Sequence, residues 1–360
     1  MPAVSDSVWQ AADTTPGAIE GALRSMLAER HAESASYVPA RALNLVTVVD
    51  REWSGEIANR LRKVGRYHAS RTVVCSVEPG RTTIDATATI ASDTEPRPGE
   101  FALLRETVIL SVGEQHLPHL DQIVDPLVVT DLATVVWSPH GHPEAVDALT
   151  TAPPGGMPIA QVVLLDSVDE PDPLEALHRV CALSERIAVV DLAWLRSTPW
   201  RERVAAVFDP PARRRELTLL REVEVGARPG SETAALLLLG WLCAQLGWTP
   251  SPLARVGTAL SGKVRAPRGE VTLTITPAVH LSVPGLDGIA LRTDDGATTA
   301  LTRGVGGLTE QRTEADGRTH EWTVLGASRG ESGILGEGIR QALLRDPTYA
   351  PAVRAARDLL

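Results

Sequence analysis

The sequence has little basic charge, little cysteine and no long apolar stretch. Its 360 residues include 35 Lys+Arg against 45 Asp+Glu, a formal net charge of −10. Binding to nucleic acid generally needs a basic face that replaces counterions, so we expect no nucleic-acid partner. The cysteines Cys75, Cys181 and Cys243 are isolated among apolar residues. Without a CxxC pair they offer neither a disulfide framework nor a zinc site, and we expect buried thiols.

The apolar stretches are too short for a membrane. The longest, residues 234–244, is about half of the roughly 20 residues that a bilayer-spanning helix needs. Residues 1–10 lack the basic and apolar regions of a signal peptide. We therefore expect a cytoplasmic protein with no membrane partner.

Motifs for common cofactors are missing as well. The first predicted strand ends at Val49 and continues into Asp50-Arg51-Glu52-Trp53, so no glycine-rich turn offers backbone N–H groups to a pyrophosphate. GxxxxGK[ST] is absent, and the glycine-rich residues 303–308 are interpreted as a loop. His140 and His142, which could approach His116 and His119, lie in a loop rather than on rigid elements. We expect no cofactor and no metal.

The order of apolar segments predicts an α/β fold, with a mostly parallel-sheet N-terminal domain followed by a smaller α+β domain. We assign residues 1–40 to an N-terminal helical segment, 41–212 to the α/β domain and 213–360 to the α+β domain. Thr15-Pro16 has the chemistry of a helix start. In the α/β domain, strands are expected at 43–49, 72–77, 132–137, 159–165 and 187–190, a hairpin at 83–112, and helices around Ile57 to Val64, at 143–149 and at 173–185.

The second domain is expected to pair its strands antiparallel, because short strands alternate with Asp-Gly turns at 287–288, 295–296 and 316–317. A helix at 236–246, capped by Ser231 and ended by Gly247, is apolar nearly all round and should be buried. The strands are expected at 216–225, 271–275, 288–293, 298–302 and 320–325, and a last helix at 336–345.

Residues 191–201 concentrate polar and aromatic side chains at one predicted strand-to-helix junction. The stretch reads Asp191-Leu-Ala-Trp194-Leu-Arg196-Ser-Thr-Pro199-Trp200-Arg201. Such junctions in open α/β sheets are where ligands and partners meet the fold. Thr198 could cap the helix that follows. The alternative is structural: Trp194 and Trp200 in the core, and Asp191 paired with Arg196 or Arg201.

A second polar cluster, His68-Ala-Ser70-Arg71, precedes a predicted strand. Arg71 there could bind a phosphate or carboxylate with two hydrogen bonds, or the cluster could be a turn capped by Ser70. Neither cluster combines a nucleophile, a base and an oxyanion donor. The residues therefore favour a binding or scaffolding protein over an enzyme.

Several stretches, in this order, resemble the OpcA-type glucose-6-phosphate dehydrogenase assembly proteins of actinobacteria and cyanobacteria. The most specific is Asp191-Leu-x-Trp194-x-Arg196-x-x-Pro199-Trp200-Arg201. Residues 9–29, 41–49, 68–74, 127–139, 239–248 and the final Asp346-Pro-x-x-Tyr349 also fit. The chain departs from the family at Ala69, where a proline is usual, and at Ser138, where a second tryptophan is usual.

This resemblance implies a non-catalytic protein that binds glucose-6-phosphate dehydrogenase and promotes its assembly or activity, and so NADPH production in the oxidative pentose phosphate pathway. Trp and Arg dominate interface hot spots, so we expect the 191–201 stretch to form part of the docking surface, with Asp191 orienting an arginine. The competing hypothesis is a sugar-phosphate-binding module, or a degenerate enzyme, that uses His68, Arg71 and Arg201.

Overall fold

The chain forms two compact units in the computed structural model, which describes residues 6–65, 70–92, 94–95, 99–139, 141–304, 306–325, 330–342 and 344–360. Unit 1 comprises Met1–Leu165, Ile187–Val190 and Leu335–Leu344. Unit 2 comprises Asp166–Arg186, Asp191–Ile334 and Arg345–Leu360. The division between the units therefore falls earlier in the chain than the predicted boundary at residue 212.

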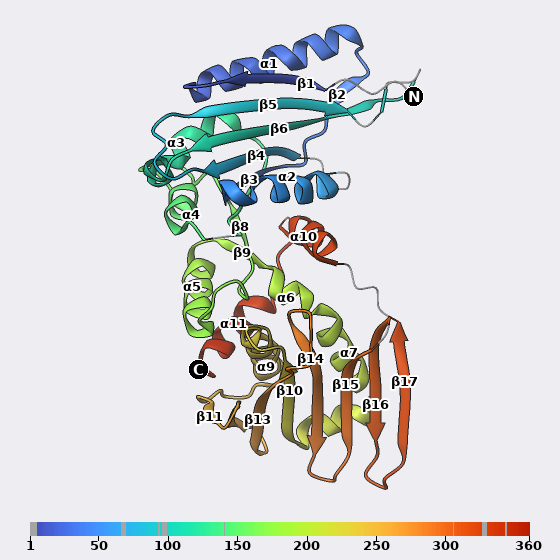
Figure 1. Ribbon diagram of the computed structural model, residues 1–360. Helices are drawn as coiled ribbons and strands as arrows, with labels where there is room; N and C mark the ends of the chain where they lie inside the picture. The colour runs from blue at the N-terminus through green and yellow to red at the C-terminus, as the bar shows by residue number, and fades with distance from the viewer. Residues whose placement is uncertain are drawn as a thin grey trace. The chain divides into compact units, whose positions relative to one another are not determined.

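Unit 1 is built on a mostly parallel sheet, as the sequence predicts. Its strand order is β1-β5-β6-β4-β3-β7-β8-β9, with β2 alongside β6 (Figure 1). Two pairs are antiparallel, the hairpin β5–β6 and the edge pair β1–β5. The parallel pairs are β3–β4, β4–β6, β3–β7, β7–β8 and β2–β6. The strands are β1 Ser7–Ala11, β2 Tyr37–Pro39, β3 Leu43–Asp50, β4 Ser70–Val77, β5 Asp85–Ser92, β6 Ala102–Val112, β7 Thr134–Trp137, β8 Val162–Leu165 and β9 Ala188–Asp191.

Burial follows the sequence pattern in this sheet. The central strands β3 and β4 are buried along nearly their whole length, as expected for strands covered on both faces. β5 and β6 alternate between buried and half-buried residues, so one face of this hairpin stays open. The helices of this region are α1 Pro16–Glu33, α2 Arg51–Gly65, η1 Glu114–His119, α3 Leu120–Val124, η2 Asp125–Leu127 and α4 Pro143–Thr150.

The first helix begins as predicted. The Thr15 hydroxyl accepts a hydrogen bond from the Ala18 N–H, and Pro16 occupies the first helical position. Ile19, Leu23 and Met26 form the buried stripe of α1, which packs on β5. The first helix is therefore part of unit 1. The predicted helical segment 1–40 also contains two strands of the sheet, β1 and β2, which were not predicted.

Unit 2 contains the second sheet, in the order β11-β12-β13-β10-β14-β15-β16-β17 (Figure 1). The neighbouring strands pair antiparallel as predicted, except β10 and β13, which are parallel. β11, β12 and β16 were not predicted. The strands are β10 Leu220–Ala227, β11 Ala254–Val256, β12 Ala259–Ala266, β13 Gly269–Pro277, β14 Leu286–Thr293, β15 Thr298–Gly304, β16 Gly307–Thr313 and β17 Thr319–Leu325.

In unit 2, the helices α5, α6 and α11 contact α9 (Glu232–Leu246), which is buried on nearly every side as its composition predicts. α9 ends at Gly247, which adopts the left-handed conformation (φ 65°). The helix α11, which was not predicted, packs against α9 and α5. The helices are α5 Pro173–Arg186, α6 Leu192–Arg196, α7 Thr198–Phe208, α8 Pro211–Arg214, η3 Arg215–Thr218, α9 Glu232–Leu246 and α11 Tyr349–Arg357, and α10 spans Gly330–Gln341.

Several local predictions were wrong. The Asp-Gly pair at 287–288 forms no turn, because both residues lie within β14. Ser231 stands at the N-cap of α9, but its hydroxyl accepts a hydrogen bond from the Gly285 N–H (3.0 Å) and does not cap the helix. Thr198 does not cap α7 either, because its hydroxyl accepts from the Arg201 guanidinium (3.0 Å). Of the predicted loop 303–308, Arg303-Gly304 ends β15 and Gly307-Leu308 begins β16.

Gly240 lets α9 and α11 approach closely. A Cβ at this position would lie 2.3 Å from the Ala352 carbonyl oxygen and 2.8 Å from the Ala356 Cβ. Gly240→Ala should therefore lower the free energy of unfolding by about 1–3 kcal/mol or more, because backbone atoms cannot yield as a flexible side chain would.

Urea denaturation measures this effect, and Gly21→Ala is the matched control. Gly21 lies in α1 with open space around its Cβ position, so alanine there should stabilise the chain by about 0.5–1 kcal/mol. Equal effects of the two substitutions would contradict the close packing of α9 on α11.

The cysteines are buried and free, as expected. Burial raises the pKa values of the Cys75 and Cys243 thiols to about 12. Across the described part of the chain, every helix is too short or too polar to cross a membrane.

Candidate partner-binding site

Asp191 lies at the junction of β9 and α6, and its side chain is buried. Its Oδ1 accepts hydrogen bonds from the backbone N–H groups of Ser167 (3.1 Å) and Ala193 (2.9 Å), the second of which caps α6. Its Oδ2 accepts from the hydroxyl of Tyr349 (2.9 Å), the first residue of α11. One carboxylate thus joins three separate segments of unit 2.

The environment of Asp191 disfavours its charged form. Burial raises the pKa of Asp191 to about 6, and the nearby carboxylate of Asp166 adds to the rise, against the lowering effect of the hydrogen bonds from Ser167 and Tyr349. The pKa of Tyr349 lies well above its usual value, first because of burial and then because of the charge on Asp191. The Asp191–Tyr349 pair therefore keeps its phenol protonated at neutral pH.

The Asp191 pKa predicts a pH-dependent stability. Its folded-state value of about 6 exceeds the ordinary value of 3.8, so the folded chain binds more protons between these pH values than the unfolded chain does. The resulting stabilisation is fully present below about pH 4 and is lost as the pH rises through about 6, with a total on the order of 3 kcal/mol.

Urea unfolding of the wild type and of Asp191→Asn at several pH values measures this contribution. The stability of the wild type relative to Asp191→Asn should fall between about pH 4.5 and pH 7 and then level off. A difference that stays constant over this window would show that Asp191 titrates normally.

Trp194 lies at the centre of a second set of contacts. Its indole Nε1 donates a hydrogen bond to Asp346 Oδ2 (2.8 Å), and its ring packs against Tyr349 with centroids 5.4 Å apart. The guanidinium carbon of Arg201 lies 3.6 Å from the Trp194 ring centroid, a cation–π contact. Trp194 is 2% exposed. Its face, edge and N–H are therefore all engaged inside unit 2.

Arg201 is held by its own stretch of chain. Its Nε donates to the Ser197 hydroxyl (3.1 Å), and its Nη2 donates to the Trp194 carbonyl (3.3 Å) and the Thr198 hydroxyl (3.0 Å). Nη1 lies 3.8 Å from Asp346. Burial lowers the pKa of Arg201 to about 10, against the raising effect of Asp346, so the group stays charged at neutral pH.

The remaining residues of the stretch differ in exposure. Arg196 forms an ion pair with Asp166 (2.6 Å), and its side chain is 24% exposed. Trp200 is buried in α7, whereas Pro199 is exposed. Pro199 and Arg196 are thus the members of the predicted set with the most surface available to a partner.

The burial of these side chains tests the two interpretations of residues 191–201, as a docking surface or as a structural cluster. Trp194 and Trp200 belong to the core, as the structural alternative predicts. The predicted pairing of Asp191 with Arg196 or Arg201 was wrong, because those arginines pair with Asp166 and Asp346 instead. Direct docking through this stretch stays a prediction, with Pro199 and Arg196 as its accessible residues.

Sequence reasoning missed the partners of this cluster. Asp166, Asp346 and Tyr349 lie far from residues 191–201 in sequence, and no periodicity links them. The only signal was the Asp346-Pro-x-x-Tyr349 motif at the chain's end, to which no role was assigned.

The predicted anion-binding residues His68, Ser70 and Arg71 belong to unit 1. His68 lies outside the described residues. The Ser70 hydroxyl lies 3.1 Å from the Thr72 hydroxyl. Arg71 is buried, donates through Nε to Glu106 (2.8 Å) and through Nη1 to the Leu127 carbonyl (3.1 Å). This geometry favours a structural role for Arg71, and anion binding here remains untested.

Glu106 is shared by two arginines. It is 1% exposed and also accepts hydrogen bonds from Arg41, one of them at 2.8 Å. Burial alone would raise the pKa of Glu106, but the hydrogen bonds and charges of Arg41 and Arg71 outweigh burial and hold it below its usual value. Sequence reasoning missed this triad. Arg71 and Glu106 are brought together only by the pairing of β4 with β6, which no local sequence pattern shows.

Charged side chains occupy the carboxyl ends of β3 and β4, where open α/β sheets usually bind ligands. Asp50 ends β3, and its Oδ1 lies 3.2 Å from His142 Nε2. α2 begins at the next residue, Arg51, which pairs with Glu78 (2.8 Å) just beyond β4. Arg81 also pairs with Glu78. An acidic side chain thus stands where a dinucleotide-binding fold offers glycine N–H groups.

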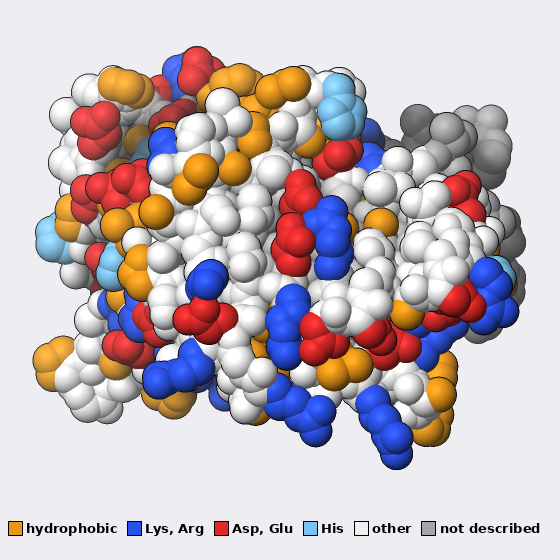
Figure 2. All heavy atoms as spheres, turned by 90° about the horizontal axis from the view of Figure 1, so that it is seen from below, with side chains coloured by type: hydrophobic (Ala, Val, Ile, Leu, Met, Phe, Trp, Pro, Cys, Tyr) orange, Lys and Arg blue, Asp and Glu red, His pale blue; other side chains and the backbone are white. Residues whose placement is uncertain are grey.

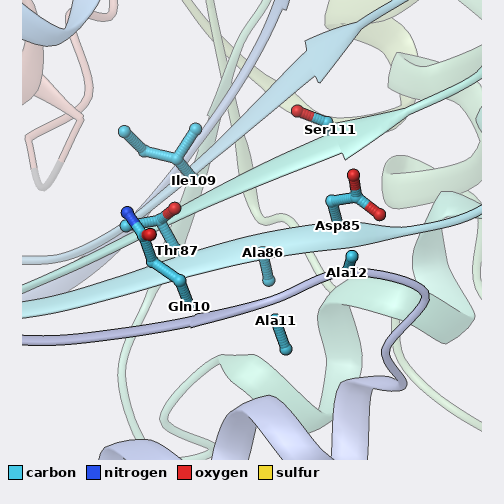
Figure 3. Close-up of a pocket in the computed structure, with 8 residues that line it drawn as sticks. All are labelled: Gln10, Ala11, Ala12, Asp85, Ala86, Thr87, Ile109 and Ser111. Carbon is cyan, nitrogen blue, oxygen red and sulfur yellow. The ribbon is translucent and has the colours of Figure 1, made fainter.

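A small pocket opens at the β1–β5–β6 edge of unit 1 (Figure 3). Its lining mixes alanines with polar side chains, of which Asp85 carries the only charge: Gln10, Ala11, Ala12, Asp85, Ala86, Thr87, Ile109 and Ser111. Asp85 already accepts hydrogen bonds from the Asp13 N–H (2.9 Å) and from Arg81 (2.8 Å). Its carboxylate is therefore satisfied within the protein. Among the described residues, His, Cys, Asp and Glu form no group suited to a metal ion.

Comparison with known proteins gives the family. Residues 62–182 match the family described as the glucose-6-phosphate dehydrogenase subunit N-terminal domain, and residues 187–353 match its C-terminal domain. The chain belongs to the OpcA-type glucose-6-phosphate dehydrogenase assembly family. The boundary between the two family domains lies close to the change from unit 1 to unit 2 near Leu165 and Asp191.

Two cyanobacterial relatives carry the name OxPP cycle protein OpcA. The protein of Synechocystis sp. is 29% identical over 146 residues, which cover 40% of this chain and 30% of the relative. The protein of Synechococcus elongatus is 27% identical over 149 residues, covering 40% and 32%. The matched region thus spans about a third of each relative's length.

One solved structure shares the fold across most of the chain. Glucose-6-phosphate 1-dehydrogenase from Mycobacterium avium superposes with a TM-score of 0.56 at 10% sequence identity, covering 89% of this chain and 91% of that chain. The α/β fold class predicted from the sequence is therefore confirmed. This likeness concerns the fold alone.

Proposed function

We propose that the chain is a non-catalytic factor that binds glucose-6-phosphate dehydrogenase and promotes its assembly or activity in the oxidative pentose phosphate pathway. The observation that carries the proposal is the match of both halves of the chain to the domains of a glucose-6-phosphate dehydrogenase subunit family. The partner, the pathway and the cytoplasmic setting are parts of the same proposal.

The ligand edge of unit 1 supports a non-catalytic role. At the end of β3, Asp50 and the immediate start of α2 replace a glycine-rich turn, and a carboxylate there would repel a pyrophosphate. Glu78 is engaged by Arg51 and Arg81. Unit 1 thus combines a dehydrogenase-like fold with acidic side chains at the carboxyl ends of β3 and β4, which disfavour binding of a dinucleotide cofactor.

The 191–201 stretch supports partner binding mainly by shaping unit 2. Asp191 and Trp194 fix α6 and α11, and this fixes the backbone that presents Pro199 and Arg196. Figure 2 shows basic and acidic side chains interspersed on one face of the molecule. We therefore look to shape, more than to one sign of charge, for the docking surface.

The sugar-phosphate alternative depends on Arg71 and Arg201. Both guanidinium groups already donate to protein acceptors, Arg71 to Glu106 and Arg201 to Ser197 and Thr198. A phosphate would have to displace these partners, so the geometry favours the protein-binding proposal.

The rate of NADPH formation by glucose-6-phosphate dehydrogenase from the same organism tests the functional half of the proposal. Adding this chain should raise the rate with a saturable dose dependence, and the chain alone should form no NADPH. An unchanged dehydrogenase rate at every ratio of the two proteins would contradict an activating role.

A further inference from the structure

The described residues bury one face of the sheet of unit 2 only in part. Residues that alternate along the strands, such as Val223, Leu273 and Leu291, are buried on the face that packs against α9 and its neighbours. Their sequence neighbours point to the other face and are half-buried or exposed. Strand pairing places these neighbours in continuous rows from β12 to β17.

We call this surface the open face, and most of its side chains are small. Ala290 pairs with Ala300, and Gly288 pairs with Thr302, at its centre. The large hydrophobic side chains exposed elsewhere in the described chain do not lie on it. The open face comprises Ser261, Lys263, Arg265, Glu270, Thr272, Thr274, Thr276, Glu222, Glu224, Gly226, Gly288, Ala290, Arg292, Thr298, Ala300, Thr302, Thr309, Gln311, Thr313, Thr319, Glu321 and Thr323.

Most of the charges on the open face compensate one another. Arg292 pairs with Glu222 (2.7 Å) and Glu224 (3.4 Å), and Lys263 pairs with Glu270 (2.8 Å). A partner that covers the face would therefore meet ion pairs already formed, together with hydroxyl and methyl groups. Burying an unpaired charge, which is costly, is largely avoided.

The open face is broad enough to supply much of a stable protein interface. The six intervals between its seven strands span roughly 29 Å, and five residues along a strand span roughly 16 Å. The projected area, roughly 460 Å², is more than half of the roughly 800 Å² of accessible surface that each partner buries in a typical stable complex. Small side chains also let a second flat layer approach to the roughly 10 Å spacing of packed sheets.

We propose that the open face is the surface that docks onto glucose-6-phosphate dehydrogenase. This inference rests on the proposed function. The shared fold supports this occupant: the likeness to the Mycobacterium avium enzyme covers 89% of this chain, so most of the architecture of unit 2 has a counterpart there. A protein of the same fold offers a sheet of similar twist, and two sheets of similar twist can pack face to face.

Unit 1 has a second open sheet face, which serves as the control. It lies over β1, β5 and β6 and includes Val8 and Leu103, each 55% exposed. Three strands span only roughly 10 Å, which is narrow for a stable interface. Thr89 lies within this face and corresponds to Thr302 in residue type and strand setting.

The test compares Thr302→Arg and Ala300→Arg with Thr89→Arg, using the full chain and glucose-6-phosphate dehydrogenase from the same organism. Each arginine adds bulk and charge to a solvent-facing position, so folding should be unaffected, as melting temperature and circular dichroism would verify. We expect the open-face variants to weaken binding to the dehydrogenase at least tenfold in calorimetry. Thr89→Arg should bind like the wild type.

Four other outcomes overturn the inference in distinguishable ways. Wild-type affinity of both open-face variants would reject the open face and leave the proposed function standing. Weakening by Thr89→Arg alone would move the interface to unit 1. A chain that dimerises by itself, and loses only that dimer on Thr302→Arg, would assign the face to a second copy. If the wild type does not bind, both the inference and the proposed function fail.

Discussion

Trp194→Ala should lower the free energy of unfolding by about 3–5 kcal/mol. The substitution removes the indole that receives Arg201 on its face, contacts Tyr349 and donates to Asp346. It also leaves the carboxylate of Asp346 and the guanidinium of Arg201 with fewer partners in a largely buried place, which adds to the lost packing. Urea denaturation followed by circular dichroism measures the loss.

Two further variants sharpen this prediction. Trp194→Phe keeps most of the ring and removes the N–H, so it should lose less, about 1–3 kcal/mol. Trp53→Ala is the matched control, because Trp53 is 43% exposed and should cost far less. If Trp194→Ala were no more costly than Trp53→Ala, Trp194 would not organise unit 2 as described.

Glu106→Gln should also be strongly destabilising, by about 3–5 kcal/mol. The side chain keeps its shape, but the charge that compensates Arg41 and Arg71 is lost. Arg71 would then be a buried cation with only the Leu127 carbonyl and a neutral amide as acceptors. The loss of stability comes from the uncompensated charge. It should therefore lower the free energy of unfolding in urea denaturation even if the backbone structure is unchanged.

The surface pair Arg24–Glu20 provides the comparison. Arg24 is 77% exposed, and exposed pairs contribute at most about 1 kcal/mol, so Glu20→Gln should have little effect. Added salt should leave the cost of Glu106→Gln nearly unchanged, since buried charges are poorly screened. Similar small losses for both substitutions would show that the triad is solvated.

Most of the fold could be predicted, because local patterns report local structure. The buried run of β3, the capped start of α1 and the apolar α9 each carry a periodicity or a cap that is complete within one short segment. β12 and β16 were missed since their sequences alternate weakly and include glycines at Gly262 and Gly307. α11 was missed because its apolar face consists mainly of alanines.

The candidate site could be predicted only in part, for a different reason. The sequence identifies Asp191, Trp194 and Arg201 as unusual, but their partners Tyr349 and Asp346 follow about 150 residues later, and only the folded chain brings them together. Packing then decides which side chains are buried. A Trp and Arg cluster typical of an interface is thus mostly internal here, and the broad open face, rich in threonine, gave no motif at all.

Binding to glucose-6-phosphate dehydrogenase is the central claim, and size-exclusion chromatography with light scattering measures it most directly. The two proteins, taken from the same organism and mixed near equal concentration, should elute together with a mass that exceeds either alone. Two separate peaks at the individual masses, at concentrations well above about 10 µM, would contradict the account. Complexes of typical interface size generally have dissociation constants below that concentration, so the two proteins would be bound.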